Sequence, residues 1–81
     1  GNYWLGMFLE ECCERDPSYT QRAGELYQEY RAFCERTGEF KRSNAEFSSA
    51  LVQAGFEKHR ASAGIVFRGL RVRGEFAGQG I

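Results

Sequence analysis

Apolar residues recur every three or four positions in three stretches of the chain, which predicts three amphipathic helices. The first set comprises Leu5, Phe8, Leu9, Cys12 and Cys13. We expect its helix to follow a lead-in at residues 1–6 and to end near Arg15, because Pro17 disfavours a helical residue before it. The stretch from Asp16 to Arg22 is rich in turn-forming residues and is expected to be a connector.

The second periodic stretch predicts a helix from Ala23 to Arg36. Its apolar stripe comprises Leu26, Tyr27, Tyr30, Phe33 and Cys34. Gly38 should end this helix, because glycine adopts the left-handed conformation at little cost. We interpret the aromatic residues of the stripe as core residues rather than as a platform for stacking nucleic-acid bases.

The third helix begins with a recognisable capping signal. Ser43 is a favourable N-cap, and Glu46 three residues later completes a capping box. The apolar face that follows comprises Phe47, Ala50, Leu51 and Ala54. Gly55 then supplies the expected stop.

A β-hairpin is predicted directly after this third helix. The strands cover residues 56–60 and 65–68, with residues 61–64 as the link and Gly64 at its end. Gly69 interrupts the alternation of the second strand, and Leu70 and Val72 resume it, which suggests a bulge or kink at the glycine.

These elements predict a small α+β fold, mostly α-helical. A helix that runs straight into a basic hairpin is the layout of a winged helix-turn-helix, in which three helices precede a hairpin wing. The alternative is a plain α+β packing unit with a solvated hairpin. The 81 residues should form one domain with an ordered core at about residues 4–73 and a flexible, glycine-rich end at residues 74–81. A start at Gly1 suggests a fragment of a larger protein.

Charge is distributed unevenly although the total is zero. Residues 1–40 carry four Lys/Arg and eight Asp/Glu, a net charge of −4, whereas residues 41–81 carry seven and three, a net charge of +4. Such asymmetry can mark a surface that faces a polyanion, although ordinary scatter over a small surface would also produce it.

The basic half supplies the candidate DNA contacts. Lys41 and Arg42 precede the cap of the third helix, where they would either clamp a phosphate or remain solvated. Polar residues of that helix able to contact phosphates or bases are Ser43, Asn44, Ser48, Ser49 and Gln53. The hairpin region adds Lys58, His59, Arg60, Arg68, Arg71 and Arg73. The helix itself contains no Arg or Lys, so sequence-specific reading is not indicated.

Catalytic and metal-binding patterns are missing from the sequence. Three cysteines, of which Cys12 and Cys13 are adjacent, and one histidine do not match the spacing of a zinc site. No phosphate-binding loop or nucleophile–base set is present, so we expect no enzymatic activity and no cofactor in these 81 residues. Buried free thiols, and the lack of a secretory signal or a long apolar run, predict a cytoplasmic protein without membrane contact.

Taken together, the segments FLEECCERDP, GELYQEYRAFCERTGE, SNAEFSSALVQAGFEKHR and GIVFRGLRV resemble a known family. It is the C-terminal domain of phage- and plasmid-type primase–helicases, replication proteins related to the poxvirus primase–helicase family. The matching positions are Phe8, Leu9, Cys12, Leu26, Tyr27, Tyr30, Phe33, Cys34, Gly38, Ser43, Phe47, Leu51, Gly55, Phe56, Phe67, Arg68, Gly69 and Leu70. The chain departs from the family at Phe33, where Trp is usual, and at Ala23, where a Ser or Thr cap is usual.

The resemblance covers about residues 5–73 and implies a non-catalytic winged-helix module appended to a helicase ATPase. The ATP, the Mg²⁺ and the primase activity would belong to other parts of the parent protein. The module would bind DNA, most plausibly duplex or origin DNA, with its third helix towards the major groove and its cations on phosphates. The alternative is a docking module for other replication proteins.

Overall fold

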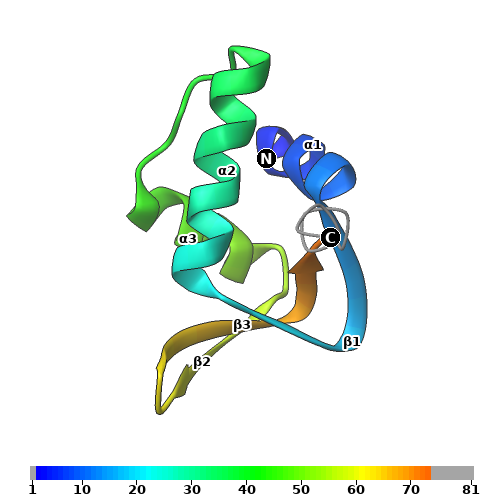
Figure 1. Ribbon diagram of the computed structural model, residues 1–81, viewed down its shortest axis with the longest axis vertical. Coiled ribbons are helices and arrows are strands. Elements are labelled where there is room, and N and C mark those ends of the chain that lie inside the picture. Colours follow the sequence, from blue (N-terminus) through cyan, green and yellow to red (C-terminus); the bar gives the residue numbers. More distant parts are fainter. Residues whose placement is uncertain (1, 74–81) are drawn as a thin grey trace, which may run out of the picture.

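The structure is a computed structural model that describes residues 2–73. Within this range the chain forms three helices and three strands in a mixed order (Figure 1). The elements are α1 (Tyr3–Cys12), β1 (Cys13–Arg22), α2 (Ala23–Thr37), α3 (Asn44–Gln53), β2 (Glu57–Ala61) and β3 (Gly64–Val72). This confirms an α+β domain with three helices. The expectation of a flexible end at residues 74–81 lies outside the described residues.

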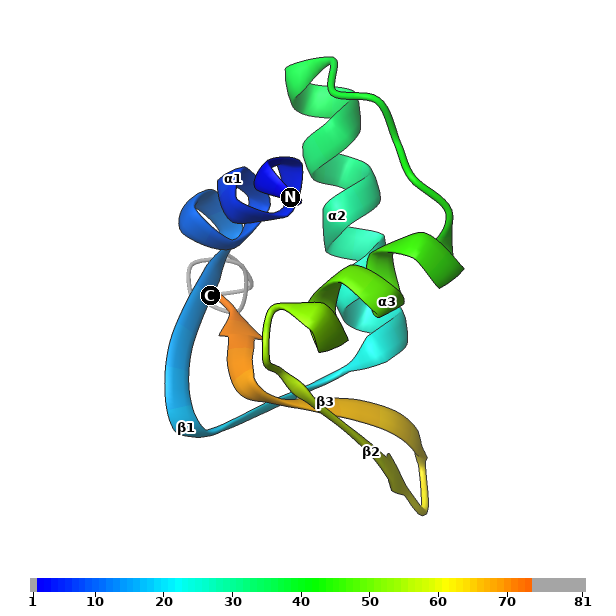
Figure 2. The same ribbon diagram turned by 180° about the vertical axis from the view of Figure 1, so that it is seen from behind.

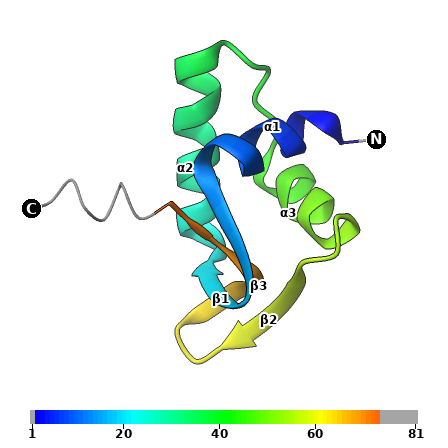
Figure 3. The same cartoon turned by 90° about the vertical axis from the view of Figure 1, so that its right-hand side faces the viewer.

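The three strands form one antiparallel sheet in the order β1-β3-β2. The central strand, β3, is therefore paired along both edges, whereas β2 lies at the edge of the sheet. All three helices lie on the same side of this sheet (Figure 3). Seen from behind, α3 leads directly into β2, so that the helix and the hairpin are neighbours (Figure 2).

Strand β1 corrects the prediction for residues 13–22. Helix α1 ends at Cys12 rather than near Arg15, because Cys13 adopts an extended conformation, with φ −128° and ψ 160°, and pairs with Val72. The expected connector is part of the sheet, and the sheet has three strands rather than a hairpin alone. Nothing in the local sequence indicated this strand, because its partner lies some fifty positions further along the chain.

Pro17 is accommodated in an irregular part of β1 rather than at the end of a helix. Arg15 pairs with Leu70 and Thr20 pairs with Arg68, so four residues of β1 lie opposite Gly69 alone. The Asp16 carboxylate accepts hydrogen bonds from the Ser18 backbone N–H at 2.9 Å and from its hydroxyl at 2.7 Å. These bonds lower the pKa of Asp16. The predicted break at Gly69 is confirmed, since its φ is 101°.

Aromatic residues from all three helices meet at the centre of the core. The ring of Phe8, which is fully buried, lies 5.7 Å from the rings of Tyr30, Phe33 and Phe47. Tyr30 and Phe47 stack with their centroids 4.6 Å apart. The predicted helical stripes are buried except for Tyr27, which is half-buried, and Ala54, which is exposed at the end of α3; β3 adds Phe67 and Leu70 to the core. The aromatic stripe of α2 is therefore core, as predicted.

The predicted helix boundaries around α2 and α3 are confirmed. Gly38 follows α2 in the left-handed conformation, with φ 79°. At α3 the Ser43 hydroxyl accepts from the backbone N–H of Glu46 at 3.2 Å, and the Glu46 carboxylate accepts from the N–H of Ser43 at 3.3 Å. Both halves of the capping box are thus formed.

Candidate nucleic-acid interface

Helix α3 exposes an uncharged polar face. Asn44, Ser49 and Gln53 are exposed, whereas Ser48 is half-buried. The Gln53 side chain accepts a hydrogen bond from the Asn2 amide at 3.0 Å, which ties the start of α1 to the end of α3. Ser43 is committed to the capping box. Asn44, Ser48 and Ser49 have no side-chain hydrogen-bond partner in the described structure, and Asn44 and Ser49 are the more exposed of the three.

The loop before α3 is held by two tyrosine hydroxyls from α2. Tyr27 donates to the carbonyl oxygen of Arg42 at 2.9 Å, and the Tyr30 hydroxyl accepts from the backbone N–H of Arg42 at 3.0 Å. The guanidinium of Arg42 lies over the ring of Trp4 at 4.7 Å and over the ring of Phe40 at 5.2 Å. Lys41 is exposed. The two cations predicted to clamp a phosphate therefore differ: Lys41 is accessible, whereas the Arg42 guanidinium packs against two aromatic rings.

The hairpin presents its candidate residues on opposite faces. Lys58 pairs with the buried Phe67 and Arg60 pairs with Ile65, so both side chains belong to the face that the helices cover. His59 pairs with Val66, which places it on the outer face. Lys58, His59 and Arg60 are all exposed. The structure therefore brings Lys58 and Arg60 together and separates them from His59.

Arg68 belongs to the outer face with His59. It lies opposite Glu57 on the neighbouring strand, and their charged groups are 3.8 Å apart. Because both side chains are about half-exposed or more, this ion pair is screened by water and contributes little stability. Arg68 therefore has one acidic neighbour and keeps access to solvent.

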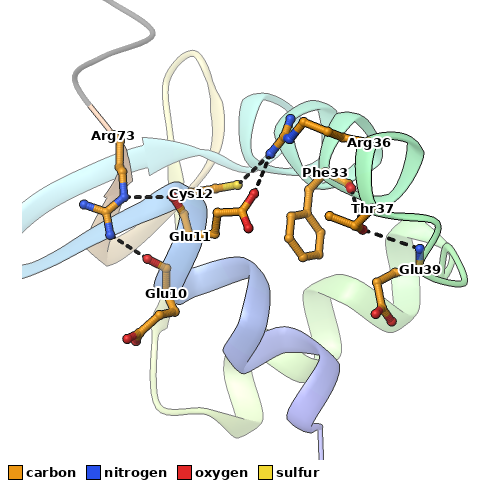
Figure 4. A network of polar contacts seen from close by, with 8 residues as sticks. All are labelled: Glu10, Glu11, Cys12, Phe33, Arg36, Thr37, Glu39 and Arg73. Atoms are coloured by element: carbon orange, nitrogen blue, oxygen red, sulfur yellow. Dashed lines mark hydrogen bonds and ion pairs between the residues drawn. The ribbon is translucent and has the colours of Figure 1, made fainter.

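Arg71 and Arg73 have structural partners. The Arg71 guanidinium forms an ion pair with Glu14 at 3.0 Å and lies 3.9 Å above the ring of Tyr19. Arg73 donates to the backbone carbonyl oxygens of Glu10 and Glu11 at the end of α1 (Figure 4). These bonds satisfy carbonyl groups that have no partner inside the helix. Arg71 thus links β3 to β1, and Arg73, directly after β3, links the chain to the end of α1; their assignment to phosphate contacts stays a prediction.

Two arginines outside the predicted set of DNA contacts lie close to the hairpin. Arg22 and Arg31 line a groove between α2 and the hairpin together with Ala63 and Ile65. Both belong to the half of the chain with a net negative charge, so the charge distribution along the chain gave no reason to select them. The signal that could have identified them is tertiary, since only the β1–β3 pairing places Arg22 opposite Val66.

The cysteines are free and buried. Burial raises the pKa of Cys12, and it raises the pKa of Cys13 to about 12, so both are neutral thiols at pH 7. The Arg36 guanidinium lies 3.5 Å from the Cys12 sulfur and also binds Glu11 (Figure 4). In residues 2–73 no three His, Cys, Asp or Glu side chains come together in a way that could hold a metal ion.

None of the helices in the described part of the chain combines the length and apolar character needed to cross a bilayer. Comparison with known proteins yields no family: no family model matches the chain, and no curated protein matches it.

Proposed function

We propose that residues 2–73 form a winged-helix domain that binds duplex DNA through α3 and the β2–β3 hairpin. The element order supports this proposal, because α3 is preceded by α2 across a short loop and followed at once by a hairpin. In this arrangement α3 would lie towards the major groove and the hairpin would be the wing.

The observation that carries the proposal is the set of accessible cations beside an uncharged helix face. Lys41, Lys58 and Arg60 are exposed, and none has an ion-pair partner within residues 2–73. A protein surface of this kind attracts phosphates, and each neutralised phosphate releases counterions. Because α3 carries neither Arg nor Lys, binding should depend on the backbone of DNA more than on its sequence.

The larger protein to which this domain would belong is a phage- or plasmid-type primase–helicase. The sequence resemblance at the core positions supports this part of the proposal. The three buried free thiols favour a reducing compartment such as the cytosol. On this view the domain contributes DNA contact, while nucleotide hydrolysis and primer synthesis take place elsewhere in the parent.

The test is a fluorescence-anisotropy titration of the 81-residue chain against labelled duplex and single-stranded DNA at two salt concentrations. Duplex binding that weakens with salt is expected. The double variant Lys58→Ala/Arg60→Ala should bind more weakly, and the slope of log K against log salt should become shallower by about two.

The matched control is Arg36→Ala/Arg71→Ala. This variant removes the same charge, but both arginines are ion-paired, with Glu11 and Glu14. It should retain nearly the wild-type slope. If the two double variants weakened binding equally, the effect would reflect net charge alone, and the hairpin could not be assigned as a DNA contact.

A protein-docking role is the second candidate, and exposed aromatic residues favour it. Tyr3 is 79% exposed and Phe40 is 73% exposed, although both are large and apolar. Tyr and Phe are enriched at protein–protein interfaces relative to the rest of the protein surface. If the chain bound neither duplex nor single-stranded DNA at low salt, this role would replace the DNA-binding proposal.

A further inference from the structure

A groove of 590 Å³ separates the first half of α2 from the hairpin. Its size is in the range of cavities that hold small ligands, about 300–1,000 Å³. Ala23 and Tyr27 contribute one wall, and Ala63 and Ile65 at the end of the hairpin contribute the other. These four side chains give the groove an apolar lining.

Two arginines border this lining. Arg22 and Arg31 are exposed, and neither forms an ion pair within residues 2–73. Glu25 is the single acidic residue that lines the groove, and its carboxylate accepts a hydrogen bond from the Gln21 amide at 2.7 Å. The groove therefore carries two arginines against one carboxylate.

The groove adjoins the cations already assigned to DNA contact. Ile65, which lines it, lies directly opposite Arg60 on β2, and the two side chains share one face of the sheet. Tyr27, which also lines it, bonds through its hydroxyl to the carbonyl of Arg42, next to Lys41. One surface thus joins the groove to the hairpin on one side and to the loop before α3 on the other.

We propose that this groove holds the sugar–phosphate backbone of one DNA strand, with Arg22 and Arg31 on consecutive phosphates and the apolar lining against the deoxyribose. The inference rests on the proposed function and adds a second contact region to it, at the end of β1 and on α2. A sugar–phosphate chain fits because it alternates charged and apolar groups, as the groove does. Continuity with Arg60 and Lys41 favours DNA over an acidic peptide.

The experiment compares Arg22→Ala/Arg31→Ala with wild type in the same anisotropy titration. Loss of two phosphate contacts should reduce the salt slope by about two, so that between 50 and 200 mM salt the affinity of wild type falls about tenfold more than that of the variant. The weakening should be equal for unrelated duplex sequences, because backbone contacts carry no sequence information. Arg22→Lys/Arg31→Lys should retain most of the slope.

A second variant should raise the affinity for DNA instead of lowering it, and its side chain keeps the size of the original one. Glu25→Gln removes the carboxylate from the groove but keeps an oxygen that can accept from Gln21. It should strengthen duplex binding several-fold at low salt and have less effect at high salt. Glu35→Gln is the control, since Glu35 lies on the same helix and does not line the groove.

The outcomes separate this inference from the function on which it rests. If Lys58→Ala/Arg60→Ala weakens binding while Arg22→Ala/Arg31→Ala and Glu25→Gln change nothing, the groove is not a DNA contact and the proposed function stands. If wild type binds an acidic, aromatic peptide and Arg22→Ala/Arg31→Ala does not, the groove is a binding site for a protein partner and the DNA assignment of the groove is overturned. If wild type binds no DNA, both proposals are overturned.

Discussion

The hydroxyl of Tyr27 on α2 donates to the carbonyl oxygen of Arg42 at 2.9 Å, directly before the cap of α3. One helix of the core thereby fixes where the next helix starts. The ring of Tyr27 contacts the aromatic core, with its centroid 5.6 Å from that of Phe47, while its hydroxyl reaches the loop. The position of α3 relative to the hairpin therefore depends on a side chain that is core at one end and polar at the other.

Tyr27→Phe should lower the free energy of unfolding by about 1 kcal/mol, because the Arg42 carbonyl loses a partly buried hydrogen bond while the ring remains. Urea denaturation followed by circular dichroism measures this. Tyr19→Phe is the control, since the contact described for Tyr19 is the stacking of Arg71 on its ring, which the substitution preserves. Equal losses in both variants would contradict a specific role for the Tyr27 hydroxyl.

Gly69→Ala should destabilise the domain by about 1–2 kcal/mol. Its φ of 101° is unfavourable for any residue with a side chain, and a Cβ there would lie 3.2 Å from Cδ1 of Phe56. Gly6→Ala provides the opposite case, because Gly6 lies inside α1 with nothing within 4 Å of an added Cβ. That substitution should stabilise the helix by up to about 1 kcal/mol. Thermal melting of the two variants should shift in opposite directions.

Arg73→Ala should reduce stability by about 1–2 kcal/mol, because two carbonyl oxygens at the end of α1 lose a charged donor. Arg31→Ala should stay within about 0.5 kcal/mol of wild type, since Arg31 is exposed and has no ion pair in the described structure. Chemical denaturation gives both values. The reverse order would show that Arg73 does not anchor α1.

Stability should fall in alkaline solution because of Cys13. The folded state raises the pKa of this thiol from its ordinary value of 9.0 to about 12, mainly through burial. A raised folded-state pKa means that the stabilisation is complete below pH 9 and is lost as pH rises towards 12. For this one group the loss is at most about 1.4 kcal/mol per pH unit.

The measurement is the free energy of unfolding of wild type and Cys13→Ala at several pH values between 8 and 10.5. Wild type should lose stability more steeply with pH than the variant, which lacks the thiol. Parallel curves would mean that Cys13 ionises as easily in the folded state as in the unfolded chain. At pH 8 the folded protein should also react with thiol reagents only as fast as it unfolds, because the described cysteines are all buried.

Local signals accounted for much of the fold. The capping box of Ser43 and Glu46 and the stop at Gly38 involve residues within a few positions of one another, so their geometry follows from short-range hydrogen bonds. The hairpin was also predictable, although its two-residue turn at Ser62 and Ala63 is tighter than the four-residue link expected. Strand β1 was not, because a strand with no alternating apolar pattern forms only when a distant partner supplies its hydrogen bonds.

The sequence predicted most of the charged residues that the candidate site contains, but not how the fold arranges them. Lys58 and Arg60 share a face that His59 does not, which follows from the pairing register of the hairpin. Arg71 and Arg73 were expected on phosphates, yet their partners are Glu14 and the end of α1. Arg22 and Arg31 were concealed in an acidic half of the chain.

By itself, the sequence determined the presence of three helices, the stop after α2, the cap of α3 and the basic hairpin, because each depends on neighbours in the chain. The tertiary structure decided which cations are committed to the fold and which remain accessible. That choice depends on contacts between residues far apart in sequence, such as Arg73 with Glu11 and Arg71 with Glu14. Charge is a property of composition, whereas the availability of a charge is a property of packing.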